Sequence, residues 1–236
     1  PTDTATIQVT GATRLNVTAT GGNTTGTGST STAQTSATGL VNNIIEDALD
    51  PLIAAMELGA VSGNITATGG TVNAFTANTT AAGAVNGYDI VNHDDTIGGI
   101  LSLDSLDLTV TATGAKLTGE TKTADTRAAG VLQDNYSDSQ YGNSTLTITG
   151  ATNLQVTATG AAPVDNGTLA VASTQAEGLS IIDNEEQSSS YTVADLGPVT
   201  ATVTANGDTA NMQSSDISTE AIGLYMVNKV AAKSLD

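Results

Sequence analysis

The sequence predicts an all-β protein with a repeat architecture, and three observations support this. An alternating pentapeptide that closes on glycine occurs five times, at residues 17–21, 65–69, 110–114, 156–160 and 203–207. Its closing glycines lie 48, 45, 46 and 47 residues apart, and a fixed period of this size indicates units that each bury an apolar face on the next. Aromatic residues make up only 3% of the chain, so the core must consist of small aliphatic side chains, which suit thin, closely stacked β layers.

A second glycine follows each closing glycine after 16 or 18 residues and lies in a small-x-Gly-apolar unit. These second markers are Gly39, Gly87, Gly130, Gly178 and Gly223. Two markers with one period predict a single all-β domain over residues 1–236. Its five repeats cover approximately residues 5–52, 53–100, 101–143, 144–190 and 191–236.

The first repeat begins with two predicted strands. Apolar and polar residues alternate over residues 5–10 and again over 15–20, and residues 10–13 between them have the composition of a turn. Residues 51–58 are predicted to form a short helix, because Asp50 suits the N-cap, Pro51 the first helical position and Gly59 the end.

The fourth repeat indicates the remaining elements. Residues 144–160 align with residues 5–21 without a gap. A loop with turn residues follows at 163–167, and a third strand is predicted at 169–174. An acidic loop at 183–186 then leads to the next repeat, so that each repeat holds three or four strands.

Two architectures satisfy this pattern. A parallel β-solenoid, with equivalent strands stacked about 4.8 Å apart, is favoured by the fixed glycine offsets and the nearly identical marker strands. An antiparallel β-sandwich or wide meander is the alternative, and the turn at residues 10–13 supports it because it resembles a hairpin connection.

The chain is strongly acidic, with 24 Asp and Glu against 6 Lys and Arg and a net charge of −18. This balance argues against a nucleic-acid partner and against binding to anionic membrane surfaces. There is no apolar run long enough to span a membrane. The chain begins at Pro1 and not at Met, which we interpret as a processed product or as part of a longer chain.

We expect no enzymatic activity and predict no catalytic residues. The chain has no Cys and a single histidine, His93, and it lacks a G-x-S-x-G segment, so neither a zinc site nor a familiar Ser-His-Asp triad is indicated. Acidic residues cluster after the second marker in four repeats, and carboxylates are suitable calcium ligands. The residues of this possible calcium site are Asp47, Asp50, Asp94, Asp95, Asp134, Asp138, Asp183 and Glu185.

Pairs of threonines at alternate positions recur in four of the five marker strands. They are Thr18/Thr20, Thr66/Thr68, Thr111/Thr113 and Thr157/Thr159, and Asn206 breaks the second row in the fifth repeat. Such rows are typical of exposed strands, where cross-strand threonine pairs contribute a few tenths of a kcal/mol each. Regular threonine arrays on a flat solenoid face also resemble those of ice-binding proteins.

The pattern V-T-A-T-G followed by A-x-G-apolar, over residues 17–227, resembles the repeats of secreted prokaryotic surface proteins. These include the β-repeats of adhesins and autotransporter passengers, and subunits of extracellular filaments. The resemblance implies a secreted, extracellular or cell-surface protein with a structural or adhesive role, and it implies no catalytic residues.

We therefore predict a structural protein that assembles with copies of itself into an extracellular filament or surface layer, by strand donation or by end-to-end stacking. The first strand and the last segment are apolar and β-prone, and neither resembles a polar cap. The predicted assembly residues are Thr4, Ile7, Val9, Leu224, Met226 and Val227. The alternative function is a binding module, either a calcium-dependent adhesin with a surface or glycan partner or an ice-binding protein.

Overall fold

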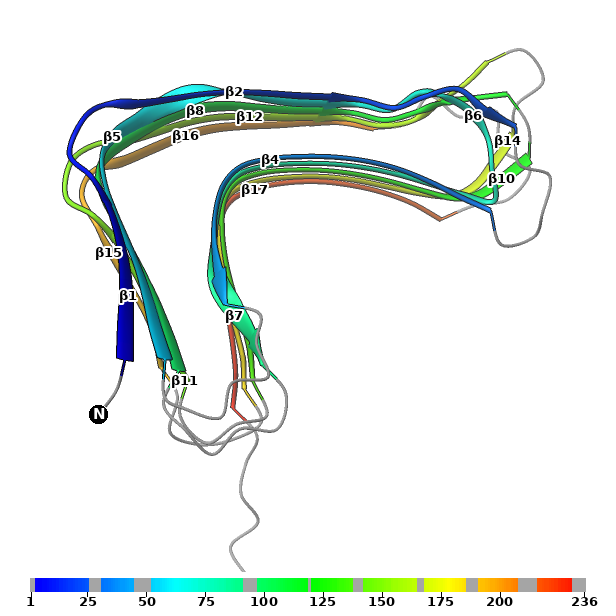
Figure 1. Ribbon diagram of the computed structural model, residues 1–236. Helices are drawn as coiled ribbons and strands as arrows, with labels where there is room; N and C mark the ends of the chain where they lie inside the picture. The colour runs from blue at the N-terminus through cyan, green and yellow to red at the C-terminus, as the bar shows by residue number, and fades with distance from the viewer. Residues whose placement is uncertain are drawn as a thin grey trace, which may run out of the picture.

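The computed structural model describes residues 3–25, 31–44, 52–90, 97–118, 120–137, 142–164, 168–185, 191–207 and 216–230. These residues are almost entirely β-strand and contain no helix, and all their strand pairs are parallel. The strands form two nested layers, each bent into an L, with a small sheet where the chain crosses from the outer to the inner layer (Figure 1). The all-β prediction is confirmed, and the antiparallel alternative is wrong for the described residues.

Three sheets make up this arrangement. The outer sheet holds β1 (Asp3–Val9), β2 (Thr13–Thr20), β5 (Leu52–Thr68), β8 (Ile97–Thr113), β11 (Gly142–Ile148), β12 (Thr152–Thr159), β15 (Tyr191–Leu196) and β16 (Val199–Asn206). The inner sheet holds β4 (Thr32–Ile44), β7 (Thr76–Ile90), β10 (Glu120–Ser137), β14 (Thr168–Glu185) and β17 (Asp216–Val230). The small sheet holds β3 (Thr24–Thr25), β6 (Thr71–Asn73), β9 (Lys116–Leu117) and β13 (Ala162–Pro163).

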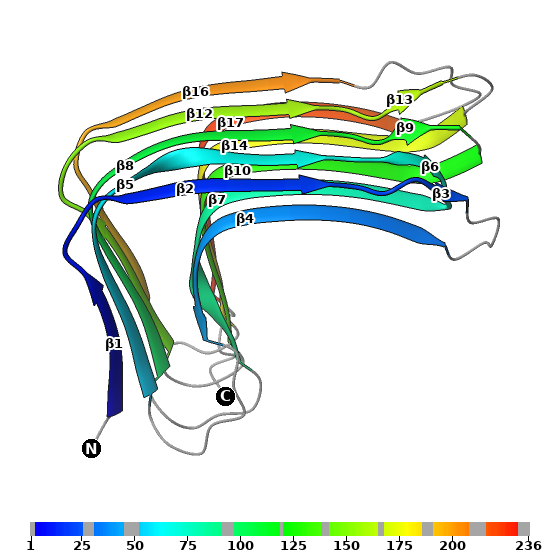
Figure 2. The ribbon, with the colours of Figure 1, turned by 45° about the horizontal axis from the view of Figure 1, so that its top comes forward.

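Equivalent strands of successive repeats lie side by side in register, stacked in chain order (Figure 2). The marker pentapeptides pair in one row: Val17 with Ile65, Ile65 with Val110, Val110 with Val156, and Val156 with Val203. Each of the first four closing glycines donates its N–H to a carbonyl of the next repeat at 2.8 Å, as Gly114 does to Thr159. The period in the sequence is therefore the register of the sheets.

The second glycine marker of the second repeat is Gly83, and the prediction of Gly87 is wrong. Gly39 pairs with Gly83 and not with Gly87, since Thr38 pairs with Ala82 and Leu40 with Ala84. The cause is a short connection: only two residues separate β6 from β7, so the marker comes 14 residues after Gly69 instead of 16 or 18. Gly87 pairs with Asn43 and Asp134 farther along the strands.

The predicted helix at residues 51–58 is also wrong. Residues 52–58 begin β5, which pairs with β1 on one side and with β8 on the other, while Asp50 and Pro51 lie outside the described residues. The segment has good helix formers, but a central strand position overrides this weak local preference. Ile7, Met56 and Leu101 thus lie in one row across three strands.

The turn at residues 10–13 is a corner and not a hairpin. β1 and β2 both run parallel to β5, which crosses the bend of the outer layer without a break. Three residues separate Val9 from Thr13, where the paired β5 has only Gly59 and Ala60 between Leu58 and Val61. This extra residue acts as a bulge, which bends a strand and leaves its direction unchanged.

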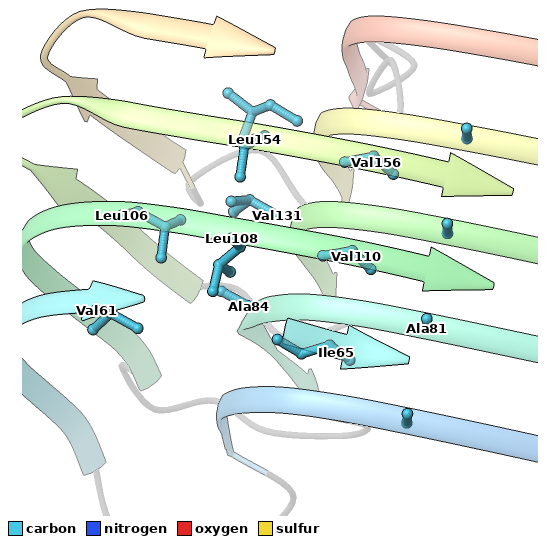
Figure 3. Close-up of a cluster of buried hydrophobic side chains, with 14 of the residues drawn as sticks. Val61, Ile65, Ala81, Ala84, Leu106, Leu108, Val110, Val131, Leu154 and Val156 are labelled. Carbon is cyan, nitrogen blue, oxygen red and sulfur yellow. The ribbon is translucent and has the colours of Figure 1, made fainter. Parts of the chain in front are cut away.

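The core is the thin space between the two layers (Figure 3). The outer sheet supplies larger side chains such as Ile65, Leu108 and Val156, which face small ones such as Ala81 and Ala84 from the inner sheet. All of these residues are buried. Combining large residues with small ones keeps the layers close without voids.

The closing glycines are required by close contacts both along the stack and between the layers, since a Cβ at Gly69 or Gly114 would lie 2.7 or 2.5 Å from the backbone of Ala115 or Ala161 in the next repeat. A Cβ at Gly69 or Gly114 would lie 2.8 or 2.6 Å from the hydroxyl of the facing Thr79 or Thr126. Thr35, Thr79, Thr126, Thr174 and Thr219 form one row across the inner sheet, so the first marker in the sequence corresponds to a row of threonines in the opposite layer.

Candidate functional site

The two ends of the repeat stack are the candidate functional site. We call the side of the first repeat formed by β1, β2 and β4 the N-terminal end face, and the side of the last repeat formed by β15, β16 and β17 the C-terminal end face. In the described residues each of these strands pairs with a neighbour on one side only. Each end face therefore presents open strand edges, which are templates for pairing with another chain.

Most of the exposed large hydrophobic side chains of the described residues belong to these end faces. At core-facing positions they are Ile7 and Val9 on the N-terminal end face, and Val199, Ile217, Leu224 and Met226 on the C-terminal end face. In the inner repeats the same rows are buried: Leu224 is 58% exposed, whereas the paired Leu179 is 4% exposed. The end faces thus expose side chains that belong to the same rows as the buried core residues of the inner repeats.

The C-terminal end face is hollow. An apolar cavity of about 450 Å³ opens there between the two layers, lined by residues that include Leu179, Leu196, Leu224 and Met226. Leu15, Val17 and Leu40 are only partly buried on the N-terminal end face. Since exposed apolar areas of this kind mark interaction sites, both end faces are suited to bury a matching surface.

Charge differs between the two end faces. The C-terminal end face carries the exposed carboxylates of Asp195, Asp216 and Glu220, whereas Arg14 is the charged side chain described on the N-terminal end face. Near the N-terminal end face, Gln8 donates a hydrogen bond to Glu57 of the second repeat at 2.8 Å. An acidic end therefore lies opposite an end with a cation and a carboxylate-binding amide.

The predicted assembly residues separate into two groups. Ile7 and Val9 lie on the N-terminal end face, and Leu224 and Met226 lie on the C-terminal end face. Thr4 lies in β1 and Val227 in β17, and their side chains are outside the described part. Sequence reasoning missed Val199 and Ile217, although aligning them with the buried Leu106 and Ala172 would have found them.

The predicted calcium residues lie largely outside the described residues. Five of them lie outside the described residues: Asp47, Asp50, Asp94, Asp95 and Asp138. For the other three, Asp134, Asp183 and Glu185, the structure describes the backbone position in a strand and not the side chain. Asp134 lies near the C-terminal end of β10, at the same end of the inner sheet as Asp183 and Glu185 of β14. The described side chains form no group of three acidic or histidine residues that could hold a metal ion, and calcium binding stays a prediction.

The threonine pairs of the marker strands form two rows across the outer sheet. Thr66, Thr111 and Thr157 pair in register, as do Thr68 and Thr113. These side chains alternate with the core-facing residues, so they lie on the outward face, where they are half-buried or exposed. In the last repeat Asn206 donates a 3.4 Å hydrogen bond to the hydroxyl of Thr159.

Two polar arrangements lie within the inner sheet and its facing layer. Asn42 donates to the side-chain oxygen of Asn86 at 2.9 Å and to the carbonyl of Ile100, and Asn86 donates to the carbonyl of Thr145. These buried amides join the inner sheet to the outer sheet. On the other face of the inner sheet, Arg127 forms an ion pair with Glu177 at 2.7 Å.

Asp125 lies two residues before Arg127 on that same face, and partial burial raises the pKa of its carboxyl above the ordinary value. A raised folded-state pKa means that the stabilising contribution is complete below the unfolded-state pKa and is lost as the pH rises through the folded-state pKa. We therefore expect Asp125→Asn to be more stable than the parent at neutral pH, with a smaller loss of stability as the pH rises above the ordinary aspartate pKa of about 4. Urea denaturation across this range measures the effect, and a variant with the parent's pH profile would contradict it.

Comparison with protein-family models, with curated proteins and with solved structures finds no match. The described residues contain no helix that is long and apolar enough to cross a membrane.

Proposed function

We propose that this protein is a parallel β-solenoid that serves as a secreted structural subunit, stacking end to end with copies of itself into an extracellular filament or surface layer. The observation that carries the proposal is that core-facing positions in the first and last repeats hold exposed apolar side chains. Ile7 is 60% exposed and Met226 is 66% exposed, although the corresponding Leu101 and Ile181 are buried.

Burial of such side chains is the main driving force for association. Fully burying a Leu, Ile or Met side chain contributes about 1.5–3 kcal/mol. The unpaired backbone N–H and C=O groups of the edge strands on both end faces would form hydrogen bonds at the same time, as in β-augmentation. The low aromatic content and scarce cations disfavour nucleic acid and sugar-cleaving functions, and the resemblance to secreted surface repeats supports the extracellular location.

End-to-end stacking is favoured over strand donation by the position of β1. Residues 3–9 already pair in register with residues 52–58 of the same chain. A donated strand would have to leave this sheet, whereas stacking keeps it in place and covers its free edge.

The test is assembly of the whole chain as a function of concentration. We expect light scattering and negative-stain microscopy to show linear particles for the parent protein. Ile7→Lys and Leu224→Lys should each prevent elongation, because a lysine cannot be buried unpaired between two apolar faces. Both positions are exposed, so the monomer should still fold, which circular dichroism can verify.

Asn153→Lys is the matched control, because Asn153 is exposed on the outward face of β12 and lies in neither end face. It adds the same charge and should leave assembly unchanged. A parent protein that remains a monomer up to high micromolar concentration would overturn the proposal, as would equal inhibition by Asn153→Lys.

The threonine rows favour a second candidate function, binding to an ordered water lattice such as ice. Parallel strands lie about 4.8 Å apart and alternate side chains about 6.6 Å apart, so Thr66, Thr68, Thr111 and Thr113 present hydroxyls and methyls at regular intervals. Thermal hysteresis of the purified protein tests this function, with Thr111→Tyr as the disrupting variant. No hysteresis in the parent protein would eliminate it.

A further inference from the structure

A row of corner glycines runs through the inner sheet from the first repeat to the last. A Cβ at Gly39, Gly83, Gly130 or Gly178 would lie 2.4–2.6 Å from the carbonyl oxygen of the next glycine in the row. A backbone oxygen at this distance could move away only by a shift of the paired strand, which costs free energy, so each of these junctions requires glycine. Gly223 ends the row, and a Cβ there would have no neighbour within 4 Å.

A second row runs through the corner of the outer sheet with the opposite polarity, and it holds glycine in every repeat except the third, where Asp104 takes this place. A Cβ at Gly59 would lie 2.7 Å from the carbonyl oxygen of Gly11, and one at Gly197 would lie 2.4 Å from that of Gly150. Gly11 begins this row and has no neighbour within 4 Å of its Cβ position. Glycine thus stands at one position on each end face where the described residues impose no steric need for it.

We infer that copies stack head to tail in the register of the repeats, with the C-terminal end face of one copy on the N-terminal end face of the next. The inference rests on the proposed function and specifies its interface. In this register Val203 pairs with Val17 of the second copy, and Leu224 pairs with Leu40. The carbonyl of Gly39 in the second copy meets Gly223, so glycine becomes necessary at position 223, and Gly11 of the second copy meets the carbonyl of Gly197.

Charge supports this orientation over contact between like faces. Two C-terminal end faces would bring together the carboxylates of Asp195, Asp216 and Glu220 from both copies, and like charges in close contact are destabilising. Head-to-tail stacking instead places Asp195 beside Gln8 of the second copy. Gln8 already donates to the carboxylate of Glu57 on its other side, and it has a second amide hydrogen.

The orientation is tested by mixing two blocked proteins. Leu224→Lys blocks the C-terminal end face and Ile7→Lys blocks the N-terminal end face. Head-to-tail stacking predicts that each variant alone is monomeric and that their mixture forms one-to-one dimers and nothing longer, as measured by sedimentation velocity or mass photometry. A variant that dimerises alone would overturn the orientation and leave the proposed function intact, whereas a monomeric parent protein would overturn both.

The register is tested by Gly223→Ala. We expect this variant to melt at or slightly above the temperature of the parent monomer and to assemble at least tenfold more weakly, because its methyl group would meet the incoming Gly39 carbonyl. Gly22→Ala is the control for the added methyl group, in the connection after β2, where the Cβ position also has no neighbour within 4 Å. A Cβ at Gly70 would lie 2.2 Å from the Gly22 carbonyl oxygen, but the next two repeats hold Ala115 and Ala161 at this place, so alanine is accommodated there.

Gly22→Ala should therefore assemble like the parent. If Gly223→Ala also assembled like the parent while Leu224→Lys blocked assembly, the copies would stack out of register, and the inference would be wrong with the proposed function still standing.

Discussion

Gly130→Ala is expected to destabilise the fold by about 2–3 kcal/mol, the cost of overpacking a tightly packed site. The added Cβ would lie 2.5 Å from the carbonyl oxygen of Gly178 and 2.9 Å from a methyl of Leu154. The first contact is with backbone that is paired on both sides, and the second is with a buried side chain. Neither can withdraw without separating two repeats or the two layers, and the loss of stability is measured by equilibrium urea denaturation.

Gly223→Ala is the matched control for this substitution, because it has the same place in the repeat and no neighbour within 4 Å. Alanine in place of a strand glycine reduces the entropy lost on folding, so this control should be neutral or stabilising by up to about 1 kcal/mol. Both variants should carry Ile7→Lys, so that assembly does not contribute to the measured stability. Equal free energies of unfolding for the two variants would show that the contact along the glycine row has no energetic effect.

The repeat markers predicted the strand register well, because the close contacts that require glycine at the marker positions recur from repeat to repeat. The row of Val17, Ile65, Val110, Val156 and Val203 is read directly from the sequence. The spacing of residues in the sequence does not reveal the length of a connection. Because the connection before β7 is short, the aligned glycine of the second repeat is Gly83 and not Gly87. The helix error at residues 51–58 has a different cause, since strand pairing with two neighbours outweighs local preference.

The candidate site was predicted less completely than the fold. Ile7, Val9, Leu224 and Met226 stood out as apolar residues near the ends of the sequence, and no local pattern distinguished Val199 or Ile217. Their exposure follows from the absence of a neighbouring repeat in the described residues on that side, and only the alignment with buried rows reveals it.

The burial of Glu177 could not be predicted from the sequence. It stands in a segment that resembles the second markers of the other repeats, where a charged side chain is ordinarily solvated. In the structure its side chain is 2% exposed and contacts Arg127, a residue of the preceding repeat. The register pairs Arg127 with Gln175 and Glu177 with Ala129, so the ion pair runs diagonally between neighbouring strands, two positions out of register.

The substitution Arg127→Met should destabilise the protein by about 2–3 kcal/mol. Removing one partner of a buried ion pair leaves an uncompensated charge, with typical losses of about 3–5 kcal/mol. The lower range applies here because the Arg127 side chain is 36% exposed, so that water can reach part of the space that a shorter residue leaves. Because methionine retains the aliphatic packing of arginine, the measured loss of stability reports on the removed charge and not on lost packing.

A double-mutant cycle separates the ion pair from packing. Glu177→Gln alone removes the buried charge and leaves Arg127 partly solvated, so it should cost less than Arg127→Met. The double variant Arg127→Met/Glu177→Gln should recover most of the loss, because no charge then remains buried without a partner. If the free-energy changes of the two single variants simply added in the double variant, the two side chains would not be energetically coupled. The burial of Glu177 would then result from packing and not from the ion pair.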